Sequence, residues 1–245
     1  MSRLENKVAL ILGGAKGIGL AISQRFASEG ATTWLTSRRN EELEAASQTI
    51  KGTARPVRAD VSQISELTRI VDLIKTESRQ IDVLVINAGM AEYATIDDVT
   101  PTHFDAVFGL NVRSPLFALQ AALPLMKEGA SVVLIGSVAD VIGTPGYGVY
   151  GASKAALRSF ARTWTRELSA RGIRVNVVAP GPVDTEMMRA ASEELRNEII
   201  STIPLSRMGK PEEIASAVLF LASDESSYIA IAGAEICVDG GMTQV

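Results

Sequence analysis

The sequence predicts a doubly wound α/β fold built on one parallel β-sheet, and three features point to it. Short, apolar, β-branched runs alternate with longer amphipathic stretches along the 245 residues. Two of these runs, Val83–Ile86 and Val132–Ile135, are apolar on both faces, as buried parallel strands are. A glycine-rich segment, Gly13 to Gly19, directly follows the first run. Right-handed crossovers between successive strands then place helices on both faces of the sheet.

Seven strands are expected, at 7–12, 32–36, 55–59, 82–86, 130–136, 173–178 and 234–238. Helices are expected between them, at 17–29, 40–50, 63–77, 101–127, 149–170 and 211–222. We expect a seven-stranded sheet of the Rossmann type with strand order 3-2-1-4-5-6-7. No repeat, low-complexity tract or linker interrupts the chain, so residues 1–245 are expected to form a single dinucleotide-binding catalytic domain.

Composition excludes several classes of function. The net charge of −4 and the lack of any basic run argue against nucleic acid as a partner. Cys237 is the only cysteine and His103 the only histidine, so we expect no disulfide and no metal site, and a Ser-His-Asp triad is disfavoured. The apolar run after Lys7 is too short for a signal peptide or a membrane span, which predicts a cytoplasmic protein without a membrane partner.

Glycine, polar and charged residues follow six of the expected strands, at the sheet edge where doubly wound folds bind their ligands. In chain order, the segments that contain these residues are Gly13, Gly14, Ala15, Lys16, Gly17, Ile18 and Gly19; Ser37, Arg38 and Arg39; Asp60 and Val61; Asn87, Ala88 and Gly89; Ser137; and Pro180 and Gly181. Six strand ends that meet at one edge predict one composite site.

The glycine segment predicts a site for the pyrophosphate of a dinucleotide. Gly13, Gly17 and Gly19 allow a tight turn and a close approach of the backbone to phosphate, and the helix that follows presents free N–H groups. A glycine run alone is a weak signal. Its position directly after the first strand strengthens the prediction.

The end of the second strand predicts which dinucleotide is bound. NAD-binding proteins carry an acidic residue about twenty positions after the glycines, whereas this chain has Ser37 there, followed by Arg38 and Arg39. No carboxylate is expected to repel a 2′-phosphate, and two guanidinium groups and Lys16 are available to bind it. NADP(H) is therefore predicted to be preferred over NAD(H). The alternative is that Arg38 and Arg39 are solvated charges at the start of the next helix.

The ends of the third and fourth strands are expected to hold the adenosine. Asp60 would accept a hydrogen bond from the adenine amino group, and the Val61 N–H would contact a ring nitrogen. The segment Asn87-Ala88-Gly89 would approach the adenosine ribose. The alternatives are that Asp60 is an N-cap for the helix that follows and that Gly89 is only a turn residue.

Tyr150 and Lys154 carry the chemistry. Their i, i+4 spacing places both on one face of the helix expected at 149–170. A free tyrosine titrates near pH ~10, and a nearby cation lowers its pKa by roughly 1–3 units. The phenol becomes a usable proton donor and acceptor near neutral pH. Ser137, on a nearby strand end, is placed to hold the carbonyl that receives the proton. The pattern predicts an oxidoreductase.

Several short motifs lie along the chain: Gly-x-x-x-Gly-x-Gly at 13–19, Asn-Ala-Gly at 87–89, Asn111, Ser137, Tyr-x-x-x-Lys at 150–154, Pro180-Gly181 and Val-Asp-Gly-Gly at 238–241. Together they resemble the short-chain dehydrogenase/reductase family over nearly the whole chain. Within that family the chain is similar to 3-oxoacyl-(acyl-carrier-protein) reductases and NADP-dependent alcohol dehydrogenases.

The resemblance implies a role for each of four residues. Tyr150 donates a proton to the substrate carbonyl oxygen as hydride arrives from the nicotinamide, and Ser137 hydrogen-bonds that oxygen. Lys154 binds the nicotinamide ribose and lowers the tyrosine pKa. Asn111 holds a water that continues a proton relay. Because Pro115 lacks an N–H, it leaves the Asn111 carbonyl without its helical partner and should kink the helix.

The resemblance also implies the surroundings of the reaction. Thr185 and the backbone of Val183 would contact the nicotinamide carboxamide. Residues 183–207 are expected to form a helical lid over the substrate. A homotetramer is implied, in which the helices at 101–127 and 149–170 pack across subunits.

The sequence departs from the family pattern at three places. Leu12 stands where many relatives have a threonine that stabilises the glycine loop, and 228–233 is longer than the usual turn into the last strand. Residues 127–131 lack the arginine of carrier-protein reductases, although Arg171 is present. The predicted substrate is therefore a small-molecule ketone, aldehyde or alcohol, uncharged and apolar or bulky. Alternatives are a 3-oxoacyl thioester of carrier protein or CoA and, less favoured, a non-catalytic NADP sensor or a sugar-nucleotide epimerase.

Overall fold

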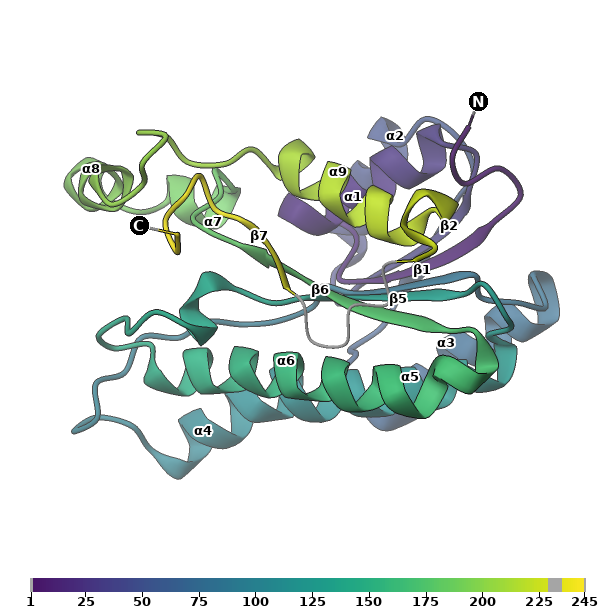
Figure 1. Ribbon diagram of the computed structural model, residues 1–245, viewed down its shortest axis with the longest axis horizontal. Helices are drawn as coiled ribbons and strands as arrows, with labels where there is room; N and C mark the ends of the chain where they lie inside the picture. Colours follow the sequence, from purple (N-terminus) through teal and green to yellow (C-terminus); the bar gives the residue numbers. More distant parts are fainter. Residues whose placement is uncertain (1, 229–234, 245) are drawn as a thin grey trace.

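The structure is a computed structural model that describes residues 2–228 and 235–244. One parallel sheet crosses the molecule in the order β3-β2-β1-β4-β5-β6-β7, which confirms the predicted topology (Figure 1). The strands are β1 (Val8–Leu12), β2 (Thr32–Ser37), β3 (Ala54–Arg58), β4 (Val83–Ile86), β5 (Ser131–Ile135), β6 (Arg174–Pro180) and β7 (Glu235–Val238). The order reverses beside β1, so the crevice for a ligand lies between the ends of β1 and β4.

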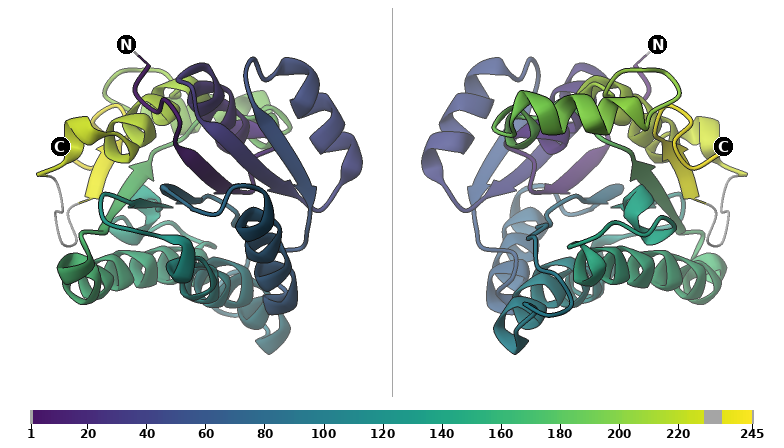
Figure 2. Two further views of the ribbon diagram at one scale, coloured as in Figure 1. Left: turned by 90° about the vertical axis from the view of Figure 1, so that its right-hand side faces the viewer. Right: turned by 90° about the vertical axis from the view of Figure 1, so that its left-hand side faces the viewer.

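Helices cover both faces of the sheet, as Figure 2 shows from two sides. One layer contains α1 (Gly17–Ser28), α2 (Asn40–Thr49) and α9 (Pro211–Ala222). The other contains α3 (Ile64–Glu77), α4 (Pro101–Phe108), α5 (Ser114–Ala122) and α6 (Gly148–Leu168). These bounds confirm the expected helices to within two residues, except at 101–127.

Buried apolar clusters on both faces of the sheet hold the layers together. Alternate residues of β1 point to opposite faces, so Ile11 packs with Ile22 of α1 and Leu219 of α9, and all three are fully buried. Leu10 instead joins the core beneath α3, α5 and α6, where Leu84 of β4 is also buried. Complete burial of each such side chain stabilises the fold by about 1.5–3 kcal/mol.

The helix expected at 101–127 is interrupted. It consists of α4, a π-helical turn at Gly109–Arg113, α5 and a 3₁₀ turn at Leu123–Leu125. The π turn ends beside Pro115, whose missing N–H breaks the regular i→i−4 ladder. The predicted disturbance therefore takes the form of a π turn that contains Asn111.

One helical run, Pro101–Leu125, is long and apolar enough to cross a membrane by length and composition alone. The core helix of a globular protein meets the same criterion. Here Ala118, Leu119 and Ala122 of this run pack in the core against the sheet.

The expected lid at 183–207 contains two short helices, α7 (Glu186–Arg189) and α8 (Glu193–Ser201). Asp184 pairs with Arg189 at 3.0 Å and with Arg196 at 3.8 Å, which ties both helices to the end of β6. Figure 1 shows α7 and α8 beyond the end of the sheet to which β6 leads. Nearly all of the longer turn expected at 228–233 lies outside the described residues.

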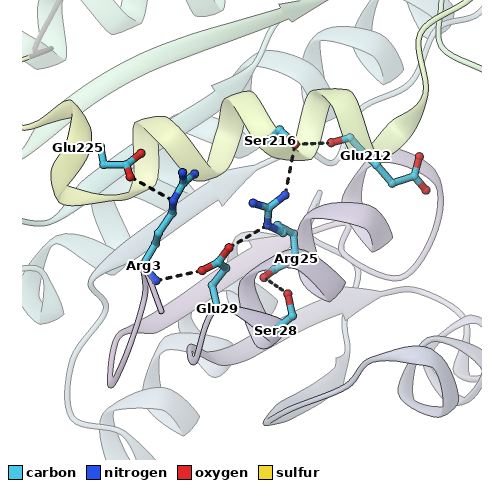
Figure 3. A network of polar contacts seen from close by, with 7 residues as sticks. All are labelled: Arg3, Arg25, Ser28, Glu29, Glu212, Ser216 and Glu225. Carbon is cyan, nitrogen blue, oxygen red and sulfur yellow. Dashed lines mark hydrogen bonds and ion pairs between the residues drawn. The ribbon is translucent and has the colours of Figure 1, made fainter. Parts of the chain in front are cut away.

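A polar network fixes the start of the chain to α1 and α9 (Figure 3). Glu29 accepts from the Arg3 N–H at 3.0 Å and pairs with Arg25 at 3.1 Å. Arg3 also pairs with Glu225 at 3.1 Å, and Arg25 reaches Ser216 of α9. These groups are partly exposed, so each pair contributes roughly 0–1 kcal/mol.

Candidate active site

The glycine segment forms a tight turn in which the backbone of Gly13 and that of Gly19 come so close that no side chain fits between them. Gly13 has a φ of +76°, and a Cβ at Gly19 would lie 1.9 Å from the Gly13 carbonyl oxygen. Asn87 at the end of β4 donates from Nδ2 to that carbonyl at 2.8 Å. The turn is thus held against the neighbouring strand, at the point where the strand order reverses.

This turn fits a pyrophosphate. Lys16, the N-cap residue of α1, makes no side-chain cap hydrogen bond, and the first turn of α1 contains no acidic residue. The N–H groups there are left for an external anion, which the helix dipole favours. Thr185 lies across the turn, with its Cγ2 3.4 Å from where a Gly17 Cβ would stand. Gly14, Ala15 and Ile18 complete the turn and lie within the same segment.

A threonine hydroxyl stabilises the glycine loop after all. Leu12 is buried in the sheet and has no hydroxyl. Instead, the Gly13 N–H donates to Oγ1 of Thr36 in β2 at 3.0 Å. The sequence departure at Leu12 is therefore compensated by a neighbouring strand. Thr36 precedes Ser37 by one residue, but the sequence did not indicate this contact because it depends on strand pairing.

The end of β2 carries a carboxylate that the sequence did not predict. Ser37 Oγ and the Arg39 guanidinium both bind Glu42 of α2, and Lys16 Nζ lies 3.2 Å from the same carboxylate. Burial opposes ionisation of Glu42, but the hydrogen bonds from Arg39, Ser37 and Lys16 outweigh it and lower the pKa to about 2. The expectation that no carboxylate stands here is wrong, because the first turn of α2 folds back over the strand end. Arg38 is exposed.

The residues expected around the adenosine make local contacts. Asp60 accepts from the Ser62 N–H at 3.1 Å and from its hydroxyl at 2.8 Å, a turn that precedes α3. The N-cap of α3 is Gln63, so Asp60 is not its cap. The Val61 carbonyl accepts from Ser114 Oγ at 2.6 Å, which links this strand end to α5.

Gly89 lies closer to Asn111 and Lys154 than expected. A Cβ on Gly89 would stand 3.2 Å from Asn111 Oδ1 and 3.4 Å from Lys154 Nζ. The preceding Ala88 N–H donates to the Leu12 carbonyl at 2.8 Å, which fixes the segment against β1. The segment 87–89 therefore connects the glycine turn with Asn111 and Lys154.

Tyr150 and Lys154 lie in the first two turns of α6, beside the end of β5. Ser137 hydrogen-bonds the phenol, and Lys154 Nζ donates to the Ile135 carbonyl at 2.8 Å and lies over the Tyr150 ring at 5.6 Å. Burial lowers the pKa of Lys154 to about 8. Burial also raises the pKa of Tyr150, and the Ser137 bond opposes this only partly. The predicted lowering of the tyrosine pKa is thus not found, because burial dominates.

Asn111 is held by groups that the sequence did not indicate. Its Oδ1 accepts from the Met90 N–H at 2.9 Å, and its Nδ2 donates to the Met90 carbonyl at 2.8 Å and to Ser153 Oγ at 2.9 Å. Ser153 in turn donates to the Tyr150 carbonyl at 2.6 Å. The sequence could have indicated Ser153, because its position three residues after Tyr150 places its hydroxyl on the same face of the helix.

The end of β6 closes the site on the opposite side. The Gly181 N–H donates to the Val238 carbonyl at 3.1 Å, and a Cβ there would lie 2.8 Å from Asp239 Cα, so glycine at 181 permits the close approach. Val183 is buried and bridges to Gly209. Pro180, Gly181, Val183 and Thr185 therefore lead from the end of β6 to α7, and their contacts with a cofactor stay a prediction.

An aromatic row leads outward from Tyr150. The ring of Tyr147 meets that of Tyr150 edge-on at 6.5 Å and that of Tyr93 at 5.7 Å. The Ala94 N–H donates to the Gly146 carbonyl at 2.8 Å, which joins the two loops that carry these rings. Tyr93 is exposed, so the row runs from the buried site to the surface.

The family is decided by comparison with known proteins. The family model described as Enoyl-(Acyl carrier protein) reductase matches residues 13–243. The structure of a short-chain dehydrogenase/reductase from Serratia marcescens superposes with a TM-score of 0.93 at 34% identity, covering 98% of this chain and 99% of that chain. The chain belongs to the short-chain dehydrogenase/reductase family. Members of this family are oxidoreductases, and the family implies a nicotinamide cofactor.

Curated relatives within the short-chain dehydrogenase/reductase family differ in substrate. The oxidoreductase asL5 of Sarocladium schorii is 39% identical, covering 100% of this chain and 99% of that protein. A 3-oxoacyl-(acyl-carrier-protein) reductase, FabG of Thermotoga maritima, is also 39% identical, covering 98% and 99%. A 3alpha-hydroxysteroid dehydrogenase of Mediterraneibacter gnavus is 36% identical, covering 97% of each chain.

Proposed function

We propose that this enzyme interconverts a ketone or aldehyde with the corresponding alcohol, using NADP(H), with Tyr150 as the general acid and base. The observation that carries the proposal is the grouping around the Tyr150 phenol. Ser137 hydrogen-bonds it, Lys154 lies over its ring, and the segment 87–89 connects Lys154 to the glycine turn. A proton donor, a carbonyl-binding hydroxyl and a phosphate-binding turn at one sheet edge are what carbonyl reduction requires.

The bound nicotinamide supplies or accepts the hydride, and the chain's own residues handle the proton. Ser137 holds the substrate oxygen next to the Tyr150 hydroxyl. Tyr150 donates its proton to that oxygen during reduction and takes it back during oxidation. Lys154, which donates to the Ile135 carbonyl, would hold the hydroxyls of the nicotinamide ribose. Asn111, in the π turn, continues the proton relay toward solvent.

Cofactor preference for NADP(H) is supported by the donors at the end of β2. Ser37 and Arg39 lie on this edge, and Lys16 reaches it from the glycine turn. Charge-assisted hydrogen bonds to a phosphate favour it by about 1.5–3 kcal/mol each. We expect kcat/KM to be higher with NADPH than with NADH. Equal values for the two would refute the preference.

The substrate is proposed to be uncharged and apolar or bulky. The row of Tyr93, Tyr147 and Tyr150 offers an aromatic wall, and Val141, in the loop that follows Ser137, is exposed. A relative that acts on a hydroxysteroid supports a bulky apolar substrate. Arg171 donates to the Leu123 carbonyl at 2.8 Å, so its guanidinium is already engaged at a helix end. A carrier-protein thioester, as in the FabG relatives, is the second candidate.

Two further features belong to the proposal. Residues 183–207 act as a lid over the substrate within a single catalytic domain, with Asp184 as its ion-paired base.

The chain forms a homotetramer through the face that carries Phe104, Phe108 and Phe160. Phe104 stacks on Phe108 at 4.3 Å and is nevertheless exposed, which supports a covering partner.

The experiment that tests the function follows NADPH oxidation with ketones, aldehydes, β-keto esters and a 3-oxosteroid. Tyr150→Phe is run alongside, with NADPH binding measured by fluorescence. We expect turnover of at least one carbonyl class, and its loss in the variant with NADPH affinity nearly unchanged. Turnover that survives in Tyr150→Phe would refute the assigned role. Tight NADPH binding by the wild-type enzyme without turnover of any class would favour a sensor.

A further inference from the structure

We propose that Glu42 is a built-in competitor for the 2′-phosphate of NADP and thereby sets how strongly the enzyme prefers NADP over NAD. The inference rests on the proposed function, because it takes Ser37, Arg39 and Lys16 to be the phosphate-binding donors. It adds a residue that opposes them.

The three donors converge on one carboxylate. Lys16 comes from the glycine turn, Ser37 from the end of β2 and Arg39 from the N-cap of α2, and all three bind Glu42. The Glu42 side chain is 15% exposed, whereas those of Lys16 and Arg39 are 61% and 62% exposed. The carboxylate therefore lies beneath the cations, which stand at the surface over it.

Two cations and a hydroxyl around one anion are the donor set that a phosphate monoester uses. Glu42 satisfies this set from within the chain. A 2′-phosphate can reach the same donors only by displacing the carboxylate or by accepting its repulsion at a few ångströms. NAD carries a hydroxyl at this position, and a carboxylate can accept its hydrogen bond.

The competition does not depend on pH in the working range. Although burial opposes ionisation, the hydrogen bonds from Arg39, Ser37 and Lys16 bring the pKa of Glu42 to about 2. Glu42 also lies in the first turn of α2, where the helix dipole favours a negative charge. The carboxylate therefore remains charged at and around neutral pH.

The test uses nucleotide fragments that carry no nicotinamide, so that binding is measured without turnover. Calorimetry at fixed ionic strength compares 2′,5′-ADP, which has the 2′-phosphate, with 5′-AMP, which lacks it. In Glu42→Gln we expect the Kd for 2′,5′-ADP to fall roughly tenfold or more, with the Kd for 5′-AMP unchanged or higher.

Two control variants separate competition from other effects. Glu41 lies in the same turn of α2 and acts on Arg39 only through space, so Glu41→Gln removes the same charge without freeing a donor. Glu42→Asp keeps the charge, so we expect its Kd for 2′,5′-ADP to fall much less than that of Glu42→Gln. Thermal melting confirms that each variant is folded.

Three outcomes would overturn the inference. Equal gains in Glu41→Gln and Glu42→Gln would show a general charge effect. Unchanged or weaker binding of 2′,5′-ADP by folded Glu42→Gln would show that Glu42 organises the donors or has no effect. If both the wild-type enzyme and Glu42→Gln bound the two fragments equally, the NADP preference itself would fail as well. Carbonyl reduction through Tyr150 would still stand in each case.

Discussion

At the scale of single residues, the burial of Lys154 lowers the free energy of unfolding, because its charged form is desolvated in the folded state. Its pKa falls from an ordinary value near 10.5 to about 8, so the charged form is disfavoured in the folded state. The penalty is present at neutral pH and is relieved as the pH rises from about 8 toward 10.5. Such a penalty is tolerated where the charge serves the reaction.

We therefore predict that Lys154→Met is inactive but has a Tm at pH 7 no lower than that of the wild-type enzyme. The gain from removing a buried charge offsets the hydrogen bond lost to Ile135. Differential scanning calorimetry and turnover, measured on the same samples, check both parts. A Tm several degrees lower would mean that the ammonium stabilises the fold.

The same pKa predicts the pH dependence of the reaction. As the pH rises through about 8, Lys154 loses its proton, while the raised pKa of Tyr150 keeps the phenol protonated. The kcat/KM for carbonyl reduction should fall along this limb, because the free enzyme loses the cation that binds the ribose. A pH–rate profile in which NADPH is varied at a saturating concentration of the carbonyl substrate measures it. A flat profile to pH 10 would contradict this role of Lys154.

A second buried group, Glu235, predicts a pH effect on stability. Burial, then the nearby Asp140, raises its pKa from 4.5 to about 7, and Arg158 lies 3.7 Å from each carboxylate. The folded state thus binds more protons, and stability falls as the pH rises from about 4.5 to about 7. Glu235→Gln should raise the unfolding free energy at pH 8 by about 1–3 kcal/mol and change it little at pH 4.5. Denaturant titrations at the two pH values test this; equal shifts at both would contradict it.

The sequence predicted the chemistry of the site better than its contacts. Tyr150 and Lys154 could be selected because they share one helix face, Ser137 because it follows a strand end, and Asn111 because the chain resembles the family. Glu42 could not, because its contacts depend on how α2 folds back over β2. The raised pKa of Tyr150 likewise depends on burial, which motif spacing does not report.

At the scale of elements, strands were predicted closely because apolar β-branched runs between turn residues mark buried parallel strands. The helix at 101–127 was predicted as one piece because its composition is helical throughout. The π turn at Gly109–Arg113 inserts a different hydrogen-bond period that residue propensities do not encode. Only Pro115 pointed to a disturbance there.

The glycine turn is the element whose geometry can be tested most sharply. Gly19→Ala would place a Cβ 1.9 Å from the Gly13 carbonyl oxygen, so the turn must open. We expect the Kd for NADPH to rise roughly tenfold or more. Gly109→Ala is the matched control, since its Cβ meets nothing within 4 Å. Equal, small effects in both variants would place the pyrophosphate elsewhere.

At the scale of the whole molecule, the exposed aromatic face of α4 to α6 predicts assembly. The wild-type enzyme should have a mass in solution of four 26.0 kDa chains. Phe104→Glu places a charge on this face and should reduce that mass. Ile96→Glu changes an equally apolar, more exposed residue outside the face and should leave it unchanged. Light scattering after gel filtration measures both, and a monomeric wild-type enzyme would refute the tetramer.

The central claim is that hydride passes between the nicotinamide and a carbonyl carbon while Tyr150 supplies the proton. The most direct measurement uses NADPH deuterated on the transferred position at C4 of the nicotinamide, with mass spectrometry of the product. We predict one deuterium on the carbinol carbon of the alcohol for each NADPH consumed, and no labelled alcohol with Tyr150→Phe. NADPH consumed without deuterium in the product, or labelled alcohol formed at the wild-type rate by the variant, would contradict the claim.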